Sequence, residues 1–319
     1  MHCDKLLDLT VEGLGGVGFQ LTQQSRAGEL DKVVGYEVVQ KPAEFRLPKK
    51  KMMLLRRALM FLVNRRCVDT AVLRSLLGMW IFGSLLRRDL LSIPHAVFRF
   101  LEKYENQTVA WWPLARDEVR AMAQVIPLMV CHVGSPILHW LFSTDAMGAN
   151  DYDHGGYGIG VTELDDVEVD SLLQQGEALG RSIARLDGLQ GAKFPQRALR
   201  PTVPYTLLPD KLFLPDRWVA VDYGRWKYGD HITIGESRTV LKMLRRVGGW
   251  PALHGKALFS LQDNMPTACA MTKGRSPSFA LNRVLRMKAA VCLAARLRAF
   301  LPWVESARQP ADELSRIQW

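Results

Sequence analysis

Cysteines, histidines in metal-binding spacing and long apolar runs are all scarce in this sequence, and each shortage excludes a class of protein. The five cysteines among 319 residues are odd in number and widely scattered, so we expect reduced thiols rather than a zinc site or a disulfide framework. The seven histidines show no ligand spacing either. Residues 122–142 carry no formal charge, but two prolines and a glycine interrupt the stretch, which argues against a membrane span.

The composition favours a folded chain with a polyanionic partner. Hydrophobic residues make up 48% of the chain and charged residues 23%, which excludes a mainly disordered protein, and the length favours two domains. The N-terminus carries charge where a signal peptide needs an apolar run, so we expect an intracellular protein, cytoplasmic or nuclear, with no membrane partner. The net charge of +10 favours nucleic acid as the polyanion, ahead of an anionic membrane surface.

The positive charge is concentrated in two tracts. Residues 41–66 hold nine basic side chains and one acid, and residues 273–298 hold seven basic side chains and no acid. Residues 163–170, in contrast, hold five acids and no base. This distribution predicts a preferred face for a phosphate backbone. The alternative, that the tracts are the solvated faces of amphipathic helices, stays open at this point.

The N-terminal 130 residues are predicted to be mostly helical after one β-hairpin. Short β-rich runs at residues 31–39 and 44–47, separated by a turn-like segment, predict the hairpin. Apolar residues at helical spacing predict a helix over residues 51–64. Further helices are expected over residues 70–86, 92–103 and 114–129.

From about residue 136 the pattern changes to strands that are followed by alternating helices and strands, which predicts an α/β domain with a mixed sheet. Residues 163–215 begin with acids and continue with many prolines, so we expect an insertion between two strands there. The expected strands cover residues 137–143, 157–162, 217–228, 257–262 and 301–305, and the expected helices cover residues 235–246 and 278–300.

Four carboxylates occupy the ends of these expected elements. Asp145 ends the first strand of the α/β region, and Asp263 ends its apolar strand. Glu236 lies in the first turn of one helix, and Asp312 opens the last helix. Each acid alone has an ordinary explanation as a cap or as a complement to a helix dipole. Taken together, the four could converge on one edge of a sheet.

Five sequence pieces around these acids resemble the ribonuclease H domain of retroelement polymerases, over about residues 136–319. The pieces are, in chain order, Ser143-Thr144-Asp145-Ala146, GGYGIGV, HITIGESRTVLKML, LQDN with MTKGRSPSFALNRVLR, and QPADELSR. The resemblance implies a ribonuclease H-like mixed five-stranded sheet with flanking helices. Upstream, residues 18–21, 33–39 and 46–66 resemble the end of a reverse transcriptase palm. Residues 1–131 would then form a mostly helical thumb/connection-like region with a short β-hairpin.

The resemblance also implies a chemistry. Ribonuclease H enzymes hold two Mg²⁺ ions, with Mn²⁺ as a possible substitute, between acidic side chains and cleave the RNA strand of RNA–DNA hybrids. By this analogy Asp145, Glu236 and Asp263 are the core ligands, and Asp312 completes the second metal site. The catalytic aspartates of a polymerase palm are not recognisable, so reverse transcription by this chain alone is not expected.

Substrate binding is expected from the second basic tract. Residues 272–276 are predicted to open the long basic helix, where Lys273, Arg275 and Ser276 could hold phosphate. Arg283 and Arg286 are three residues apart and could share one helix face, although ordinary solvation of these cations is the alternative.

Two other functions stay open. The chain could be a catalytically inactive nucleic-acid-binding relic or a domesticated fragment of a retroelement. Its thumb-like helices could also form an interface with other parts of a retroelement polyprotein.

Overall fold

The computed structural model of the chain describes residues 32–149, 154–176 and 208–317. These residues divide into two compact units: residues 32–87 with 96–134, and residues 88–95 with the described residues from 135 to 317. The palm-like piece at residues 18–21 and the centre of the expected insertion lie outside the described residues. Within the described ranges, no helix has both the length and the apolar character that crossing a membrane requires.

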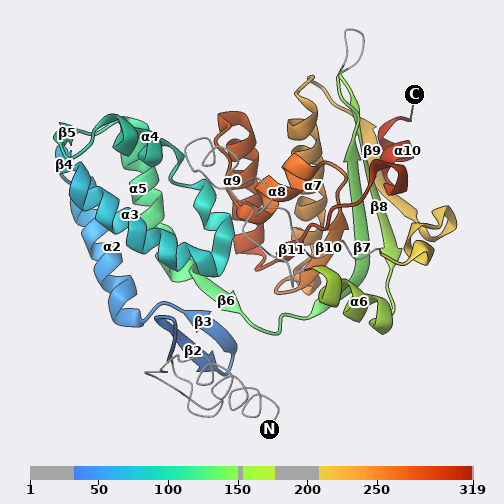
Figure 1. Ribbon diagram of the computed structural model, residues 1–319, viewed down its shortest axis with the longest axis horizontal. Coiled ribbons are helices and arrows are strands. Elements are labelled where there is room, and N and C mark those ends of the chain that lie inside the picture. Colours follow the sequence, from blue (N-terminus) through green and yellow to red (C-terminus); the bar gives the residue numbers. More distant parts are fainter. Residues whose placement is uncertain (1–31, 150–153, 177–207, 318–319) are drawn as a thin grey trace, which may run out of the picture. The chain divides into compact units, whose positions relative to one another are not determined.

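Four helices in the first unit lie close to the positions expected from apolar periodicity (Figure 1). They are α2 (Lys49–Val63), α3 (Thr70–Ser84), α4 (His95–Lys103) and α5 (Pro113–Val125). Two carboxylates accept hydrogen bonds from backbone N–H groups at helix N-termini in this unit. Asp69 accepts hydrogen bonds from the backbone N–H groups of Ala71 and Val72 at the start of α3. The buried Glu118 accepts from Ala96 and Val97 at the start of α4.

The expected hairpin belongs to a four-stranded antiparallel sheet with strand order β1-β2-β3-β6. Its strands are β1 (Lys32–Val33), β2 (Tyr36–Gln40), β3 (Ala43–Arg46) and β6 (Val130–His132). A single strand over residues 31–39 was therefore the wrong prediction. Val34 and Gly35 have positive φ angles of 48° and 85°, so the chain turns between β1 and β2. A second small sheet pairs β4 (Cys67–Asp69) with β5 (Thr108–Ala110).

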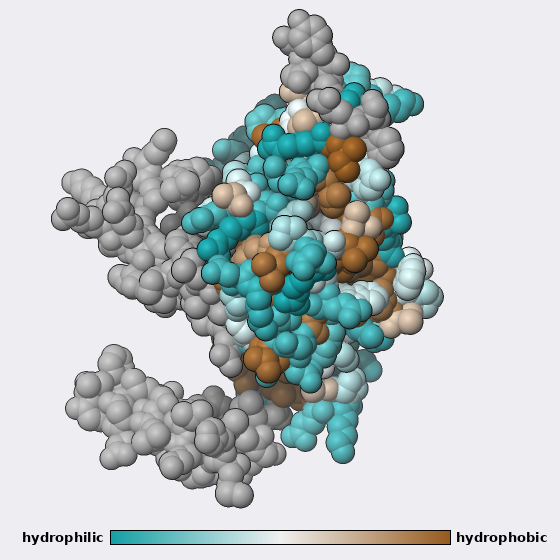
Figure 2. Space-filling view, turned by 90° about the vertical axis from the view of Figure 1, so that its right-hand side faces the viewer, coloured by the Kyte–Doolittle hydropathy of each residue, from teal (hydrophilic) through white to brown (hydrophobic). Residues whose placement is uncertain are grey.

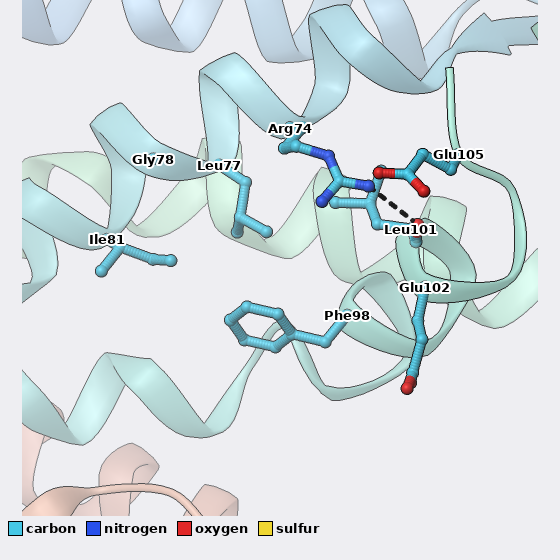
Figure 3. Close-up of a pocket in the computed structure, with 8 residues that line it drawn as sticks. All are labelled: Arg74, Leu77, Gly78, Ile81, Phe98, Leu101, Glu102 and Glu105. Atoms are coloured by element: carbon cyan, nitrogen blue, oxygen red, sulfur yellow. Dashed lines mark hydrogen bonds between the residues drawn. The ribbon is translucent and has the colours of Figure 1, made fainter. Parts of the chain in front are cut away.

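A pocket of about 490 Å³ lies between α3 and α4 in the first unit (Figure 3). The side chains of Leu77, Ile81 and Phe98 line its apolar part, and two glutamates line its other end. Arg74 donates a hydrogen bond from Nη2 to the carbonyl of Leu101, 3.1 Å away. This cation therefore satisfies a carbonyl in the last turn of α4, as basic residues near helix C-termini commonly do.

The second unit is built on the mixed five-stranded sheet that the sequence predicted, with strand order β11-β10-β7-β8-β9. The three strands β7, β8 and β9 are antiparallel, whereas β10 runs parallel to both β7 and β11. The strands are β7 (Ile137–Ala146), β8 (Gly156–Glu163), β9 (Val219–Arg225), β10 (Ala257–Leu261) and β11 (Arg298–Phe300).

Helices and turns cover both faces of this sheet. On one face, α7 (Ile232–Gly248) and α9 (Phe279–Ala294) pack against each other over Leu258 and Phe142. On the other face, α6 (Asp166–Gly176) packs over Leu141. The side that carries β9 and α10 (Asp312–Ser315) is mainly hydrophilic, with small separate groups of hydrophobic side chains (Figure 2).

The expected helix over residues 278–300 and strand over residues 301–305 are corrected by the structure. Helix α9 ends at Ala294, and Arg296 has a φ of 51°, which no helix can continue through. Residues Arg298–Phe300 then form β11, paired with β10. The alanines, leucines and arginines of this stretch favour a helix locally, but pairing with β10 prevails over that preference.

The prediction that residues 272–276 open the basic helix is also wrong. Helix α8 (Met265–Lys273), which the sequence did not reveal, ends at Gly274. This glycine has a φ of 72°, and a Cβ there would lie 2.0 Å from the carbonyl oxygen of Arg88. Ser278 is the residue that begins α9, because its hydroxyl accepts from the N–H of Leu281. Residues 274–277 therefore join two helices.

Residues 88–95 are held firmly against α9, within the second unit. Asn282 donates a hydrogen bond to the carbonyl of Ser92, and Arg286 donates to the carbonyls of both Ser92 and Ile93. The ammonium group of Lys288 forms a buried ion pair with Asp89. The basic residues of α9 therefore serve partly to hold this segment.

One acid at the start of the insertion between β8 and β9, Glu168, is buried against basic side chains. Glu168 is 3% exposed and accepts a hydrogen bond from Arg217 at 2.8 Å, while Lys211 lies 2.9 Å away. The hydrogen bond from Arg217 is the main cause that lowers the pKa of Glu168 to about 2, and burial opposes it. The ion pairs of Glu168 with Lys211 and Arg217 therefore hold the two described ends of the insertion together.

We expect Glu168→Gln to lower the free energy of unfolding at pH 7 by about 2 kcal/mol, because Arg217 loses its charged partner. The contribution of Glu168 is present above its ordinary pKa of 4.5 and is lost as the pH falls towards 2. Urea unfolding at pH 7 and pH 3 measures both effects, with the exposed Asp170→Asn as the matched control. An equal loss at both pH values would contradict the assignment.

Candidate active site

Three of the four predicted carboxylates lie together at one edge of the five-stranded sheet. Asp145 is the penultimate residue of β7, and Asp263 follows the end of the parallel neighbour β10. Parallel neighbouring strands present their carboxyl ends at the same edge, which brings these two acids close. Glu236 reaches them from the N-terminal part of α7. One ligand atom from each residue lies within 4.8 Å of the other two.

Burial makes these carboxylates hard to ionise together. Asp145 and Glu236 are each only 3% exposed. Burial raises the pKa of Asp145 to about 6, and the charges of Asp263 and Asp312 add to the rise. Burial also raises the pKa of Glu236 to about 10, reinforced by the charges of Asp145 and Asp263. Low solvation and like charge both favour protonated forms, so the cluster gains from any added positive charge.

Two oxygen atoms of the cluster fit a divalent cation. The Oε2 atom of Glu236 and the Oδ1 atom of Asp263 are buried and have no hydrogen-bond partner among the residues that the structure describes. Unpaired buried carboxylate oxygens are uncommon in folded proteins and need an explanation. Carboxylate oxygens are also the hard ligands that Mg²⁺ and Mn²⁺ accept. The residues present therefore fit a divalent metal ion, as the sequence resemblance implies.

The fourth acid, Asp312, lies beside the cluster without belonging to the three-residue group. Its charge contributes to the raised pKa of Asp145. Its Oδ1 atom accepts hydrogen bonds from Arg316, at 2.9 Å from Nε and 2.7 Å from Nη2. Arg316 in turn lowers the pKa of Asp145 slightly. An arginine four residues after Asp312 is visible in the sequence, and helical spacing could have identified this pair.

Glycines in β8 explain how the short helix α10 comes so close to Asp145. Gly158 pairs directly with Asp145 in the sheet. A Cβ at Gly158 would lie 2.6 Å from the Cβ of Leu314, and one at Gly156 would lie 2.2 Å from the carbonyl oxygen of Ser315. Because these glycines have no side chains, α10 can lie directly on the backbone of β8. The hydroxyl of Ser315, which donates to the carbonyl oxygen of Asp312 at 2.9 Å, thereby lies near the Asp145 carboxylate and lowers its pKa.

Asp263 is also fixed by a contact that sequence reasoning missed. The indole N–H of Trp303 donates to the carbonyl oxygen of Asp263 at 2.7 Å. The next residue, Asn264, begins α8 by accepting from the N–H of Thr267 at 3.0 Å. The backbone on both sides of the Asp263 side chain is therefore held in place.

The five predicted substrate-binding residues are spread along the end of α8, the following link and α9, and do not join the carboxylate cluster. Lys273, Arg275 and Ser276 are half-buried, and Arg283 is exposed. Arg283 and Arg286 line a small cavity of about 190 Å³. The guanidinium of Arg286 also holds the carbonyls of residues 92 and 93.

No family model and no curated protein matches the sequence. Among solved structures, LC11-RNase H1 in complex with an RNA/DNA hybrid is 12% identical with a TM-score of 0.32, over 55% of this chain and 92% of that chain. The N-terminal RNase H domain of Rv2228c from Mycobacterium tuberculosis is 13% identical with a TM-score of 0.30, over 55% and 90%. The foamy viral protease-reverse transcriptase in complex with an RNA/DNA hybrid is 11% identical with a TM-score of 0.28, over 98% and 56%. All three TM-scores are below 0.5, so these likenesses do not support the site, and its assignment depends on the residues of this chain alone.

We expect Glu236→Gln to raise the free energy of unfolding at pH 8 in metal-free buffer by about 2 kcal/mol, because the ionised carboxylate of the unfolded chain must take up a proton to be buried, whereas glutamine is already neutral. The pKa of Glu236 is higher in the folded protein than its ordinary value of 4.5, so folding favours its protonated form. The destabilisation by Glu236 is therefore absent below pH 4.5 and grows as the pH rises towards 10, and the difference between the proteins should vanish at pH 4. Urea unfolding across this pH range measures the effect.

The exposed Glu102→Gln is the matched control for that series and should show no such pH dependence. Added Mg²⁺ should stabilise the unmutated protein at pH 8 more than the Glu236→Gln variant. Equal stabilisation of the two proteins would remove Glu236 from the proposed ligand set.

We expect Gly158→Ala to destabilise the protein by about 2 kcal/mol, because the added methyl group would overlap Leu314 and the backbone of α10. Gly78→Ala is the control, since a Cβ at that helical position would meet no atom within 4 Å and should stabilise by about 0.5–1 kcal/mol. Thermal unfolding compares the two. If both substitutions stabilise, α10 does not pack on β8 as described.

Proposed function

We propose that the chain is a metal-dependent nuclease that cleaves the RNA strand of RNA–DNA hybrids. The observation that carries the proposal is the buried group of Asp145, Glu236 and Asp263, whose ligand atoms lie within 4.8 Å of one another. The five-stranded mixed sheet that holds these acids and the sequence pieces that surround them support the same function. The positive net charge fits a nucleic-acid substrate.

The four acids have two different roles in this proposal. Asp145, Glu236 and Asp263 are the core metal ligands, and Asp312 serves the second metal from α10. Two bound Mg²⁺ ions would activate the attacking water and stabilise the leaving oxygen of the phosphodiester. Ser315 lies beside the Asp145 carboxylate, and Trp303 fixes the backbone at Asp263.

Substrate binding would come from basic side chains that follow Asp263 in the sequence. Lys273 and Arg275 lie on either side of the turn at Gly274, with the Ser276 hydroxyl next to them. The exposed Arg283 follows in the first half of α9, and such side chains bind backbone phosphates. The hydrogen bonds of Arg286 to the 88–95 segment make it primarily a support for these residues.

A cleavage assay on an end-labelled RNA–DNA hybrid with Mg²⁺ tests the function. We expect Asp263→Asn to reduce the cleavage rate by at least about 100-fold, since loss of a metal ligand removes several kcal/mol of transition-state stabilisation. Asp216→Asn, at an exposed aspartate just after the insertion, is the control and should cleave at the unmutated rate. Chelation of the metal should abolish cleavage by all three proteins.

Other results would overturn the proposal in distinct ways. Equal cleavage by Asp263→Asn and the unmutated protein would refute the site. Hybrid binding without cleavage in either Mg²⁺ or Mn²⁺ would instead support a catalytically inactive nucleic-acid-binding relic.

A further inference from the structure

A buried glutamine connects the segment that carries Asp312 to the strand that carries Asp145. Gln309 is 6% exposed. Its Oε1 atom accepts a hydrogen bond from the hydroxyl of Ser143 at 2.6 Å, and its Nε2 atom donates to the carbonyl of Thr144 at 3.0 Å. Both ends of the amide are therefore satisfied by the two residues that precede Asp145.

The Ser143 hydroxyl extends this connection to α10. It accepts a second hydrogen bond from the backbone N–H of Ala311 at 3.2 Å, next to Asp312. Ser143 and Asp145 are two residues apart on one strand, so their side chains point to the same face of the sheet. Gln309, Ser143 and Ala311 thus form a polar clamp on the face over which α10 lies, and we use that name for these three residues below.

Apart from its packing on β8 and the position of Ser315 beside Asp145, little holds α10 in place. The helix has four residues, Asp312–Ser315, and a helix of that length has no stability of its own. Beneath it lie the glycines of β8, which offer no side chains for packing. The ion pair between Asp312 and Arg316 is internal to the segment, so it does not attach the segment to the sheet. The polar clamp is the buried attachment nearest to Asp312 in the chain.

We propose that Gln309 is a positioning residue that sets Asp312 at the right distance from the other three carboxylates. This proposal rests on the proposed function, because it gives Asp312 its part as a ligand of the second metal. Without the clamp, α10 would remain folded onto β8 for only part of the time. The three core ligands, which lie on β7, on α7 and just after β10, would be unaffected.

The test uses Gln309→Leu, which keeps the side-chain volume and removes both hydrogen bonds. Asn282→Leu is the matched control, because Asn282 is also a buried amide with two backbone partners in the same unit, Ser92 and Ser276. Hydrogen exchange of the backbone amides in residues 311–316 is measured first, without metal. Binding of Mn²⁺ is then measured by calorimetry on the same full-length proteins.

We expect Gln309→Leu to accelerate exchange in residues 311–316 at least about tenfold while β10 keeps its protection. It should also weaken the second Mn²⁺ binding event by about 10–100-fold, as loss of a group that orients a ligand commonly does, and leave the first event unchanged. Ser143→Ala should reproduce both effects, and the double variant should add little to either single change. Asn282→Leu should change neither measurement.

Unchanged exchange in residues 311–316 of Gln309→Leu would overturn the positioning role, whatever the metal result. Equal weakening of both Mn²⁺ events, or the same pattern in Asn282→Leu, would also overturn it, since either points to general destabilisation. If the unmutated protein binds no Mn²⁺, the proposed function fails and the role assigned to Gln309 fails with it, and the exchange data then show only a structural attachment.

Discussion

Like-charged carboxylates buried at one edge of a sheet are the constraint on which the second unit depends. The protein places Asp145 and Glu236 where water cannot solvate them, next to Asp263, and folding must compensate for that arrangement. Protonation offsets part of the cost, as the raised pKa values of Asp145 and Glu236 indicate. A cluster that is costly without a cation is poised to bind one, because binding relieves both desolvation and repulsion.

The surrounding structure holds the acids in this unfavourable arrangement. The parallel pairing of β7 and β10 sets the separation of Asp145 from Asp263. The buried Gln262 donates from its side-chain amide to the hydroxyls of Thr144 on β7 and Ser260 on β10, and so connects the two strands close to the acids. On the other side, the bare glycine surface of β8 allows a backbone approach that any side chain would prevent. Precise positions thus come from backbone geometry and buried polar contacts rather than from salt bridges.

Much of this arrangement could be predicted from the sequence, because local signals place the strand ends. The apolar run Ala257–Leu261 ends just before Asp263, and the glycine-rich β8 follows Asp145. Contacts between distant residues could not be predicted in that way. Ser143 and Gln309 are 166 positions apart, and neither has a local pattern that indicates its partner.

The incorrect predictions of secondary structure have the same physical origin. Residues 298–300 favour a helix on their own and become a strand only because β10 is there to pair with them. Helix α8 was missed because its nine residues carry weak amphipathic periodicity and begin directly after a strand end. In both cases the tertiary neighbours, which the sequence does not display, determined the local structure.

The segment Arg88–His95 has a consequence for any attempt to divide the protein. The chain leaves the first unit after Arg87, contributes this segment to the sheet-containing unit, and returns to the first unit at Ala96. A cut near residue 135 would therefore remove the partners of Asn282, Arg286 and the buried ammonium group of Lys288. The sheet-containing unit is therefore not one continuous stretch of sequence, and excising residues 135–319 would leave the buried ammonium group of Lys288 without its acidic partner.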